Sequence, residues 1–203
     1  MAIAIPADLV KSLRDRTGAG FMECKAALTE ANGDIEGATT LLRKRGLAQA
    51  AKRAGRTTSQ GLVGSYIHMG GKIGVLVELN CESDFVARTE QFQALAKDIA
   101  MHVAASDPRY VRREDVPADA LDKEREIYRA QFGQSGKPAP VVEKIVEGKL
   151  GSFYSQVVLL DQPFVRDTTL TVSQVIADAT AKMGEHITVS RFSRFKVGEH
   201  PAD

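Results

Sequence analysis

The side chains most able to do chemistry in this sequence are two cysteines and four histidines, and their spacing argues against a catalytic or metal site. Cys24 and Cys81 are far apart and form no CxxC pair, so neither a redox motif nor a disulfide framework is indicated. Both lie on apolar stripes, which favours core packing as reduced thiols over a nucleophilic role. No histidine stands at zinc-ligand spacing from a cysteine; the four are His68, His102, His186 and His200.

The glycine motifs that usually hold phosphates are incomplete. Gly71-Lys72 is followed by Ile73 where a P-loop needs Ser or Thr, and no glycine precedes it at the required distance. Gly18 and Gly20 follow a predicted helix and lack the third glycine of a dinucleotide fingerprint. HExxH and GxSxG are absent as well. The sequence therefore predicts a binding protein and not an enzyme, with no cofactor and no bound metal.

The composition is that of a globular protein. The 203 residues are 43% hydrophobic and 26% charged, with 27 Lys and Arg against 26 Asp and Glu, a formal net charge of +1. A dedicated nucleic-acid binder is normally visibly basic, so no direct nucleic-acid contact is expected. No apolar run approaches the roughly 20 residues of a membrane span, and residues 1–5 are too short for a signal-peptide core. We therefore predict a cytoplasmic protein without membrane contact.

The elements that must position any binding residues begin with a predicted three-helix bundle. Asp8 is expected to cap a first helix over residues 9–16, a second helix covers residues 21–31, and Asp34 caps a third. An Ala-rich, basic connector helix over residues 47–54 is expected to leave this bundle. Together these elements form a first domain over residues 1–55.

The connector lies in a basic stretch. Residues 37–77 hold seven Lys and Arg and no Asp or Glu. One interpretation is a solvated helix face, and the other is a docking surface for an acidic partner. A ribosome- or RNA-associated binding module is thus an alternative function, although residues 78–126 hold twelve acids against seven bases and would repel RNA.

Residues 56–203 are predicted to form an α+β core with a small antiparallel sheet and several helices, so the whole chain is of the α+β class. Residues 62–69 and 72–81 read as a hairpin joined by Gly70-Gly71. A helix capped by Thr89 follows, with His102 on its polar side. Further along, the pattern predicts a helix from Pro117 to about Phe132, a loop Gly133–Pro140 and a helix carrying Val142, Ile145, Val146 and Leu150. A strand Val157–Leu160 is expected next, followed by a helix that begins with a capping box, Thr171–Gln174, and ends at Gly184. The last predicted element is a strand, His186–Val197.

The last strand carries apolar residues that alternation places on both faces. Ile187 and Val189 are expected to face one side and Phe192 the other. A sheet with apolar residues on both faces needs two covers, and a symmetric dimer could provide the second. We therefore expect a homodimer.

Three segments resemble bacterial translation elongation factor Ts. They are LRDRTGAGFMECKAAL at residues 13–28, LNCESDFVAR at residues 79–88 and QPFV at residues 162–165. The resemblance covers residues 6–198, and the first two motifs are highly specific. The sequence departs from the family at Phe21, where many members have Met, and at Ser83, where Thr is usual.

The resemblance implies guanine-nucleotide exchange on elongation factor Tu. The factor would bind Tu·GDP, promote release of Mg²⁺ and GDP, and leave when GTP enters, during the elongation phase of protein synthesis. It also implies that the N-terminal bundle is of the ubiquitin-associated type. Short members of the family, which this chain resembles in length, are thought to act as homodimers, so that two chains rebuild the complete Tu-binding surface.

The resemblance also implies which residues bind. Dislocation of Mg²⁺ from Tu is expected of Ser83, Asp84, Phe85 and Val86. Further partner contacts are expected of Arg14, Phe21, Met22 and Lys25 in the bundle, and of His68, Val165, Met183 and Gly184 in the core.

For several of these residues a structural role is the alternative. Phe85 could pack beneath the next helix, although it falls outside both apolar patterns that flank it, and Asp84 could be a simple loop or cap carboxylate. Met22 could equally belong to the bundle core. Arg166 takes a position that is often apolar in the family, so a contact of Arg166 with Tu stays open.

Overall fold

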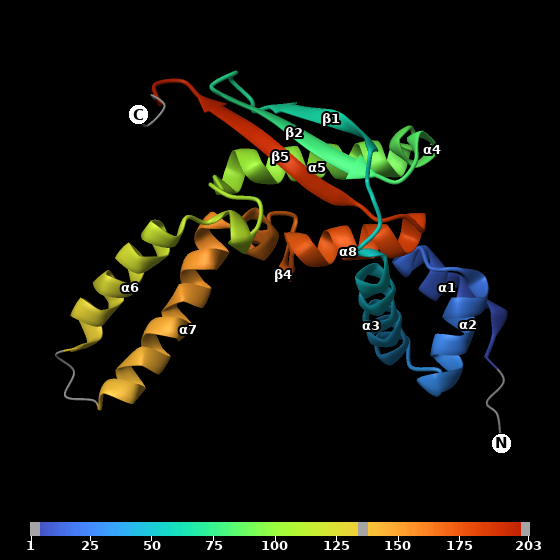
Figure 1. Cartoon of the computed structure of the whole chain (residues 1–203). Coiled ribbons are helices and arrows are strands. Elements are labelled where there is room, and N and C mark those ends of the chain that lie inside the picture. Colours follow the sequence, from blue (N-terminus) through green and yellow to red (C-terminus); the bar gives the residue numbers. More distant parts are fainter. Residues whose placement is uncertain (1–4, 134–137, 200–203) are drawn as a thin grey trace.

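The computed structural model describes residues 5–133 and 138–199, and it shows a small sheet from which two helical arms descend (Figure 1). One arm is the N-terminal bundle and the other is an α6–α7 hairpin, while α5 and α8 lie between the arms and the sheet. The α+β class is confirmed. The helices are α1 Ala7–Thr17, α2 Phe21–Glu30, α3 Ile35–Arg53, α4 Asp84–Ala87, α5 Glu90–Ser106, α6 Ala118–Gly133, α7 Ala139–Val157 and α8 Val172–Met183, and the strands are β1 Gln60–Ile67, β2 Ile73–Cys81, β3 Pro163–Phe164, β4 Asp167–Thr171 and β5 Thr188–Lys196.

The bundle forms as the sequence predicts, with one error at its start. Asp34 caps α3 by accepting from the backbone N–H groups of Glu36 and Gly37. Asp8 does not cap α1, because the helix begins at Ala7, two residues before the predicted start, and the carbonyl of Pro6 accepts the first backbone bonds. Asp8 lies instead in the first turn, where its charge suits the helix dipole.

The predicted connector is not a separate helix. Residues 47–53 continue α3 without a break, so the helix runs for 19 residues from the bundle to the core. Its outer half packs against α8, and Gly46 allows the close approach, since a Cβ there would lie 3.2 Å from Cβ of Ala181. The basic stretch therefore also carries the junction between bundle and core.

The sheet has the order β1-β2-β5 and is antiparallel throughout. The predicted hairpin is confirmed, with Gly70 and Gly71 both at positive φ in its turn. One face of β2 packs on α5 through a fully buried row of side chains: Val75, Val77, Leu79 and Cys81. Both cysteines are buried, as expected of core residues.

The prediction that Phe192 faces away from Val189 is wrong. The register shifts between Glu78 and Leu79, so that Leu79 pairs with Val189 and Val77 pairs with Phe192. This β-bulge inserts one extra residue into β5 and returns Phe192 to the core face. The opposite face of the sheet is nevertheless apolar, because other residues project from it. These exposed residues are Val63, Ile67, Leu76 and Phe195.

Three further predictions for the core need correction. His102 is fully buried, not on a polar face, because the segment around Gln162 covers α5. Residues 157–160 form no strand: Val157 ends α7, and a 3₁₀ turn, η2 (Leu159–Asp161), follows. Val158 makes an isolated parallel bridge with Tyr110, and Val157, Val158 and Leu159 are buried. The short β3–β4 hairpin is not among the elements predicted from the sequence.

Part of the loop predicted at residues 133–140 lies outside the described residues, and α7 already begins at Ala139. The capping box of α8 is confirmed by reciprocal bonds between Thr171 and Gln174. In the described part of the chain, no helix is both long and apolar enough to cross a bilayer.

The contact of β1 with α5 gives a testable prediction. A Cβ on Gly64 would lie 3.0 Å from Cβ of Ala96 and 3.3 Å from its carbonyl carbon and oxygen. Gly64→Val should therefore push α5 from the sheet and lower the free energy of unfolding by about 1–3 kcal/mol, measured in urea. Ser65→Val, on the opposite face of the same strand, is the control and should not be destabilised. Equal stability of Gly64→Val and the wild type would contradict the packing described.

Candidate partner-binding site

The segment between β2 and α5 presents a large apolar side chain to solvent. Ser83 caps the single helical turn α4, and its Oγ accepts from the N–H of Val86. Phe85, on this turn, is 84% exposed. This confirms the prediction that Phe85 belongs to neither of the apolar patterns that flank it. Val86, by contrast, packs partly against the core, and its carbonyl accepts a 2.8 Å bond from Thr89. The loop is thus fixed at both ends with Phe85 projecting from it.

A carboxylate from a distant part of the chain holds the beginning of this loop. Oε2 of Glu185 accepts from the backbone N–H groups of Glu82 at 3.1 Å and Ser83 at 2.9 Å. Its Oε1 accepts from the hydroxyl of Ser83 at 2.5 Å. Glu185 comes directly after Gly184, which ends α8 in the left-handed conformation. The C-terminus of α8 therefore orients the turn that carries Phe85.

Glu82 makes a reciprocal hydrogen bond to the segment that follows α8. Its Oε1 accepts from the backbone N–H of His186 at 2.6 Å, and its carboxylate pairs with Arg56 at 3.3 Å. The hydrogen bond from the N–H of His186 lowers the pKa of Glu82 below its ordinary value, and the guanidinium of Arg56 lowers it further. The ring of His186 in turn bonds the carbonyl of Arg56 through Nδ1 at 3.0 Å. We call these four residues, Arg56, Glu82, Glu185 and His186, the loop clamp.

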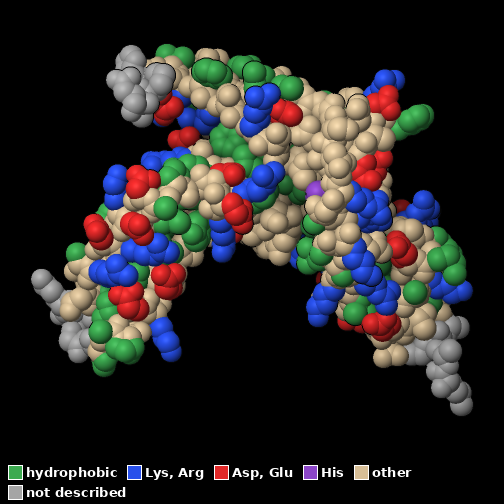
Figure 2. All heavy atoms as spheres, in the orientation of Figure 1, with side chains coloured by type: hydrophobic (Ala, Val, Ile, Leu, Met, Phe, Trp, Pro, Cys, Tyr) green, Lys and Arg blue, Asp and Glu red, His purple; other side chains and the backbone are tan. Residues whose placement is uncertain are grey.

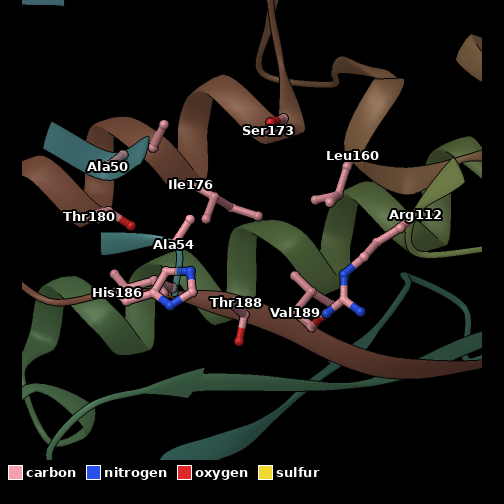
Figure 3. Close-up of a pocket in the computed structure, with 12 residues that line it drawn as sticks. Ala50, Ala54, Arg112, Leu160, Ser173, Ile176, Thr180, His186, Thr188 and Val189 are labelled. Atoms are coloured by element: carbon pink, nitrogen blue, oxygen red, sulfur yellow. The ribbon is translucent and has the colours of Figure 1, made fainter. Parts of the chain in front are cut away.

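The clamp borders a cavity of about 310 Å³ between the end of α3, α8 and the start of β5 (Figure 3). Most of its wall is apolar, with the ring of His186 at one end and the guanidinium of Arg112 at the other. Arg112 already donates to the carbonyl of Val189 at 3.3 Å, and His186 already bonds Arg56. The two ionisable side chains of the cavity wall are therefore already hydrogen-bonded to backbone carbonyls.

The remaining groups near Phe85 are not arranged for bond chemistry. Asp84 forms an exposed ion pair with Arg88 at 2.9 Å. Burial raises the pKa of the Cys81 thiol, which also donates to the carbonyl of Ser83, so this cysteine is held as a thiol. Within residues 5–133 and 138–199, no three His, Cys, Asp or Glu side chains are grouped to hold a metal.

The predicted bundle residues lie together at the end of α1 and the start of α2. All four are exposed: Arg14, Phe21, Met22 and Lys25. Met22 is 71% exposed, so it does not belong to the bundle core. A Cβ on Gly18 would lie 3.4 Å from Cε of Lys182, which places this corner of the bundle beside the end of α8, where Met183 and Gly184 lie. The structure thus brings the bundle residues, Met183 and Gly184 to one side of the core.

Two predicted residues lie elsewhere. His68 is in the β1–β2 turn, where it bonds Tyr66, at the opposite end of β2 from Phe85. The nine residues of β2 span about 30 Å. Val165 is half-exposed in the β3–β4 turn, beside Arg166, which pairs with Asp98 at 2.7 Å. One chain therefore does not bring all the predicted contacts onto one continuous patch.

Sequence reasoning missed Glu82, Glu185 and His186 as supports of the loop. The only signal was position: Glu82 and Glu185 adjoin the predicted residues 83–86 and 183–184, and His186 follows Glu185. Carboxylates at such places are usually solvated, and their pairing over more than 100 residues follows only from the fold.

Comparisons with known proteins identify the family of this chain. The family described as "Elongation factor TS" matches residues 24–199. An elongation factor Ts from Koribacter versatilis is 63% identical over 195 residues, which are 96% of this chain and 89% of the relative. Those from Thermosipho melanesiensis and Fervidobacterium nodosum are 61% and 60% identical over 96% of this chain and 100% and 99% of their own lengths. Because both measures cover nearly the whole chain, this protein belongs to the elongation factor Ts family.

Proposed function

We propose that this protein is the guanine-nucleotide exchange factor for elongation factor Tu: it binds Tu·GDP and promotes release of Mg²⁺ and GDP so that GTP can bind. The observation that carries the assignment to this site is Phe85, exposed on a turn whose neighbours are fixed by hydrogen bonds. An aromatic side chain displayed in this way can enter a partner's pocket with little loss of conformational entropy. Family membership supports the same function.

Exchange of this kind needs differential binding and no bond-making residue. The factor must bind nucleotide-free Tu better than Tu·GDP, and by reciprocity GDP weakens the factor's binding by the same ratio. A ratio of 10⁴ corresponds to about 5.5 kcal/mol, whereas one aromatic anchor usually supplies roughly 2–4 kcal/mol. We therefore propose that the exposed bundle residues and the core residues contribute the rest.

We assign the roles by chemistry. Phe85 acts as the wedge, and Ser83 and Val86 hold the turn in place. Asp84 offers an exposed carboxylate beside the wedge, which can compete for the groups that support the Mg²⁺ of Tu. Arg14, Phe21, Met22 and Lys25 provide a second contact from the domain over residues 1–55.

The RNA-binding alternative finds less support. Of the cations in the basic stretch, Arg45 pairs with Glu30 and Arg56 pairs with Glu82. The space-filling view shows acidic and basic side chains interspersed over the N-terminal arm (Figure 2). A surface of mixed sign has little attraction for phosphates.

We further propose that two copies of the chain form the working factor through the outer face of the sheet. The outward-facing residues Val63, Ile67, Leu76 and Phe195 are exposed on adjacent strands, and hydrophobic side chains gather along this edge of the molecule in Figure 2. An exposed apolar sheet face of this kind is typical of an interaction surface. A dimer would also explain why His68 and Phe85 lie at opposite ends of β2, since the second chain could supply the distant contacts.

The wedge is tested by Phe85→Ala. Loss of the ring should slow the release of fluorescent GDP from Tu by about 30- to 1000-fold, equivalent to roughly 2–4 kcal/mol. The melting temperature should barely change, because an exposed side chain stabilises the free protein little. Ile127→Ala, which trims an exposed residue of α6 on the other arm, is the control and should keep normal exchange. Normal release by Phe85→Ala would overturn the role of the wedge.

The loop clamp is tested at Glu185. Glu185→Ala removes the acceptor of three hydrogen bonds and should slow GDP release about tenfold, because the turn is no longer held before binding. Glu185→Gln keeps one oxygen for the two backbone N–H groups, and its amide can donate to the Ser83 hydroxyl, so it should retain most of the activity. Indistinguishable release rates for Glu185→Ala and the wild type would show that the loop needs no such support.

The dimer is tested by the mass in solution. Light scattering at concentrations active in exchange should give twice the 22.0 kDa of one chain. Phe195→Asp places a charge on the outer face of the sheet and should give the monomer mass, whereas Val141→Asp on α7 should not. A wild-type protein that is fully active as a 22.0 kDa species would refute the proposal.

A further inference from the structure

One buried titratable group has no part in the function described so far. His102, on α5, is fully buried. Its Nε2 lies 2.9 Å from Oε1 of Gln162, and its Nδ1 lies 3.2 Å from the backbone N of Val165. Its ring also lies beside that of Phe164, with the centroids 5.8 Å apart.

These contacts fix the tautomer of the ring. A backbone N–H can only donate, so Nδ1 accepts from Val165 and carries no proton. Gln162 donates through its amide nitrogen to the carbonyls of Gln156 at 2.7 Å and Ser106 at 3.2 Å, which turns its Oε1 toward His102. Nε2 therefore carries the proton and donates it to Gln162. Burial lowers the pKa of His102, in agreement with a neutral ring.

The group held by Nδ1 belongs to the β3–β4 turn. β3 has only two residues, and its pairing with β4 shifts register between them, so the strand ladder gives this turn little support. The turn is tied instead to α5: the N–H of Val165 to His102, and the guanidinium of Arg166 to Asp98. Asp98 and His102 stand one helical turn apart on α5, so two successive residues of the turn are fixed by one face of one helix.

We propose that His102 is a positioning residue that holds the exposed side chain of Val165 in place for the partner. The inference rests on the proposed function, in which Val165 contacts elongation factor Tu. His102 itself touches no partner because it is buried. Its effect passes through the single hydrogen bond to the backbone of Val165.

Two variants separate the two sides of the ring. His102→Asn places a side-chain oxygen near the position of Nδ1, so it can still accept from Val165, but it does not reach Gln162. His102→Gln reaches toward Gln162 and leaves the N–H of Val165 without its acceptor. Both variants lose the ring and its contact with Phe164, so both should lose stability.

The expected result is a split between stability and binding. Nucleotide-free Tu should bind folded His102→Gln roughly tenfold more weakly than the wild type, while His102→Asn should recover most of the affinity. The Val165 amide should exchange with D₂O at least tenfold faster in His102→Gln than in His102→Asn. If His102→Gln and His102→Asn bind Tu with equal affinity while Val165→Ala binds weakly, the role of His102 is overturned and Val165 still stands as a contact. Normal affinity of Val165→Ala would instead overturn Val165 as a contact, and the proposal with it.

The wild-type protein provides a test that needs no variant to fold. ¹⁵N NMR of the ring should show the neutral Nε2–H tautomer, and the Val165 amide should be protected from exchange. A proton on Nδ1, or an unprotected Val165 amide, would overturn the proposal.

Discussion

The burial of one face of β2 against α5 is the constraint on which the rest of the structure depends. β2 is the central strand of the sheet, and its inward row from Val75 to Cys81 is almost completely inaccessible to solvent. Pairing with β2 then sets which residues of β1 and β5 face α5, with one bulge in β5 at Ser190. The strand ends immediately before the turn that carries Phe85, so its register also sets where and in which direction that side chain projects.

The same strand connects the core to two other parts of the molecule through the loop clamp. Glu82 and Glu185 exchange backbone hydrogen bonds between the segments that follow β2 and α8. Arg56 adds the segment that follows α3, so the loop clamp joins this segment, the turn that carries Phe85 and the end of α8. Hydrogen bonds from backbone N–H groups to ionised carboxylates are stronger than neutral ones. A surface assembled from separate segments can in this way be presented to a partner as one rigid unit.

Rigid display suits a factor that acts only by binding. A factor that is already ordered loses less conformational entropy when it binds, so more of its contact energy appears as affinity for the partner. The buried contacts of His102 and the clamp both satisfy polar groups that would otherwise be costly to bury. They contribute no chemistry to the reaction, but they keep two exposed apolar side chains, Phe85 and Val165, in fixed positions.

The sequence by itself determined the elements whose signals are local. The capping residues Asp34, Thr89 and Thr171 and the glycine turn at residues 70–71 all rest on contacts within a few residues, and all are confirmed. The exposure of Phe85 was predictable for the same reason, because neither local apolar pattern included it.

Only the tertiary structure decided the features that join distant segments. The bulge in β5 follows from pairing with β2, and it moved Phe192 to the face opposite to the one that alternation predicts. His102 is polar by type but becomes a core residue because Gln162, 60 positions away, supplies its partner. Glu185 finds its ligands 102 and 103 positions back in the chain. A local pattern indicates whether a side chain can be buried or can form a hydrogen bond. The partner of that side chain depends on how distant elements pack, which a local pattern does not contain.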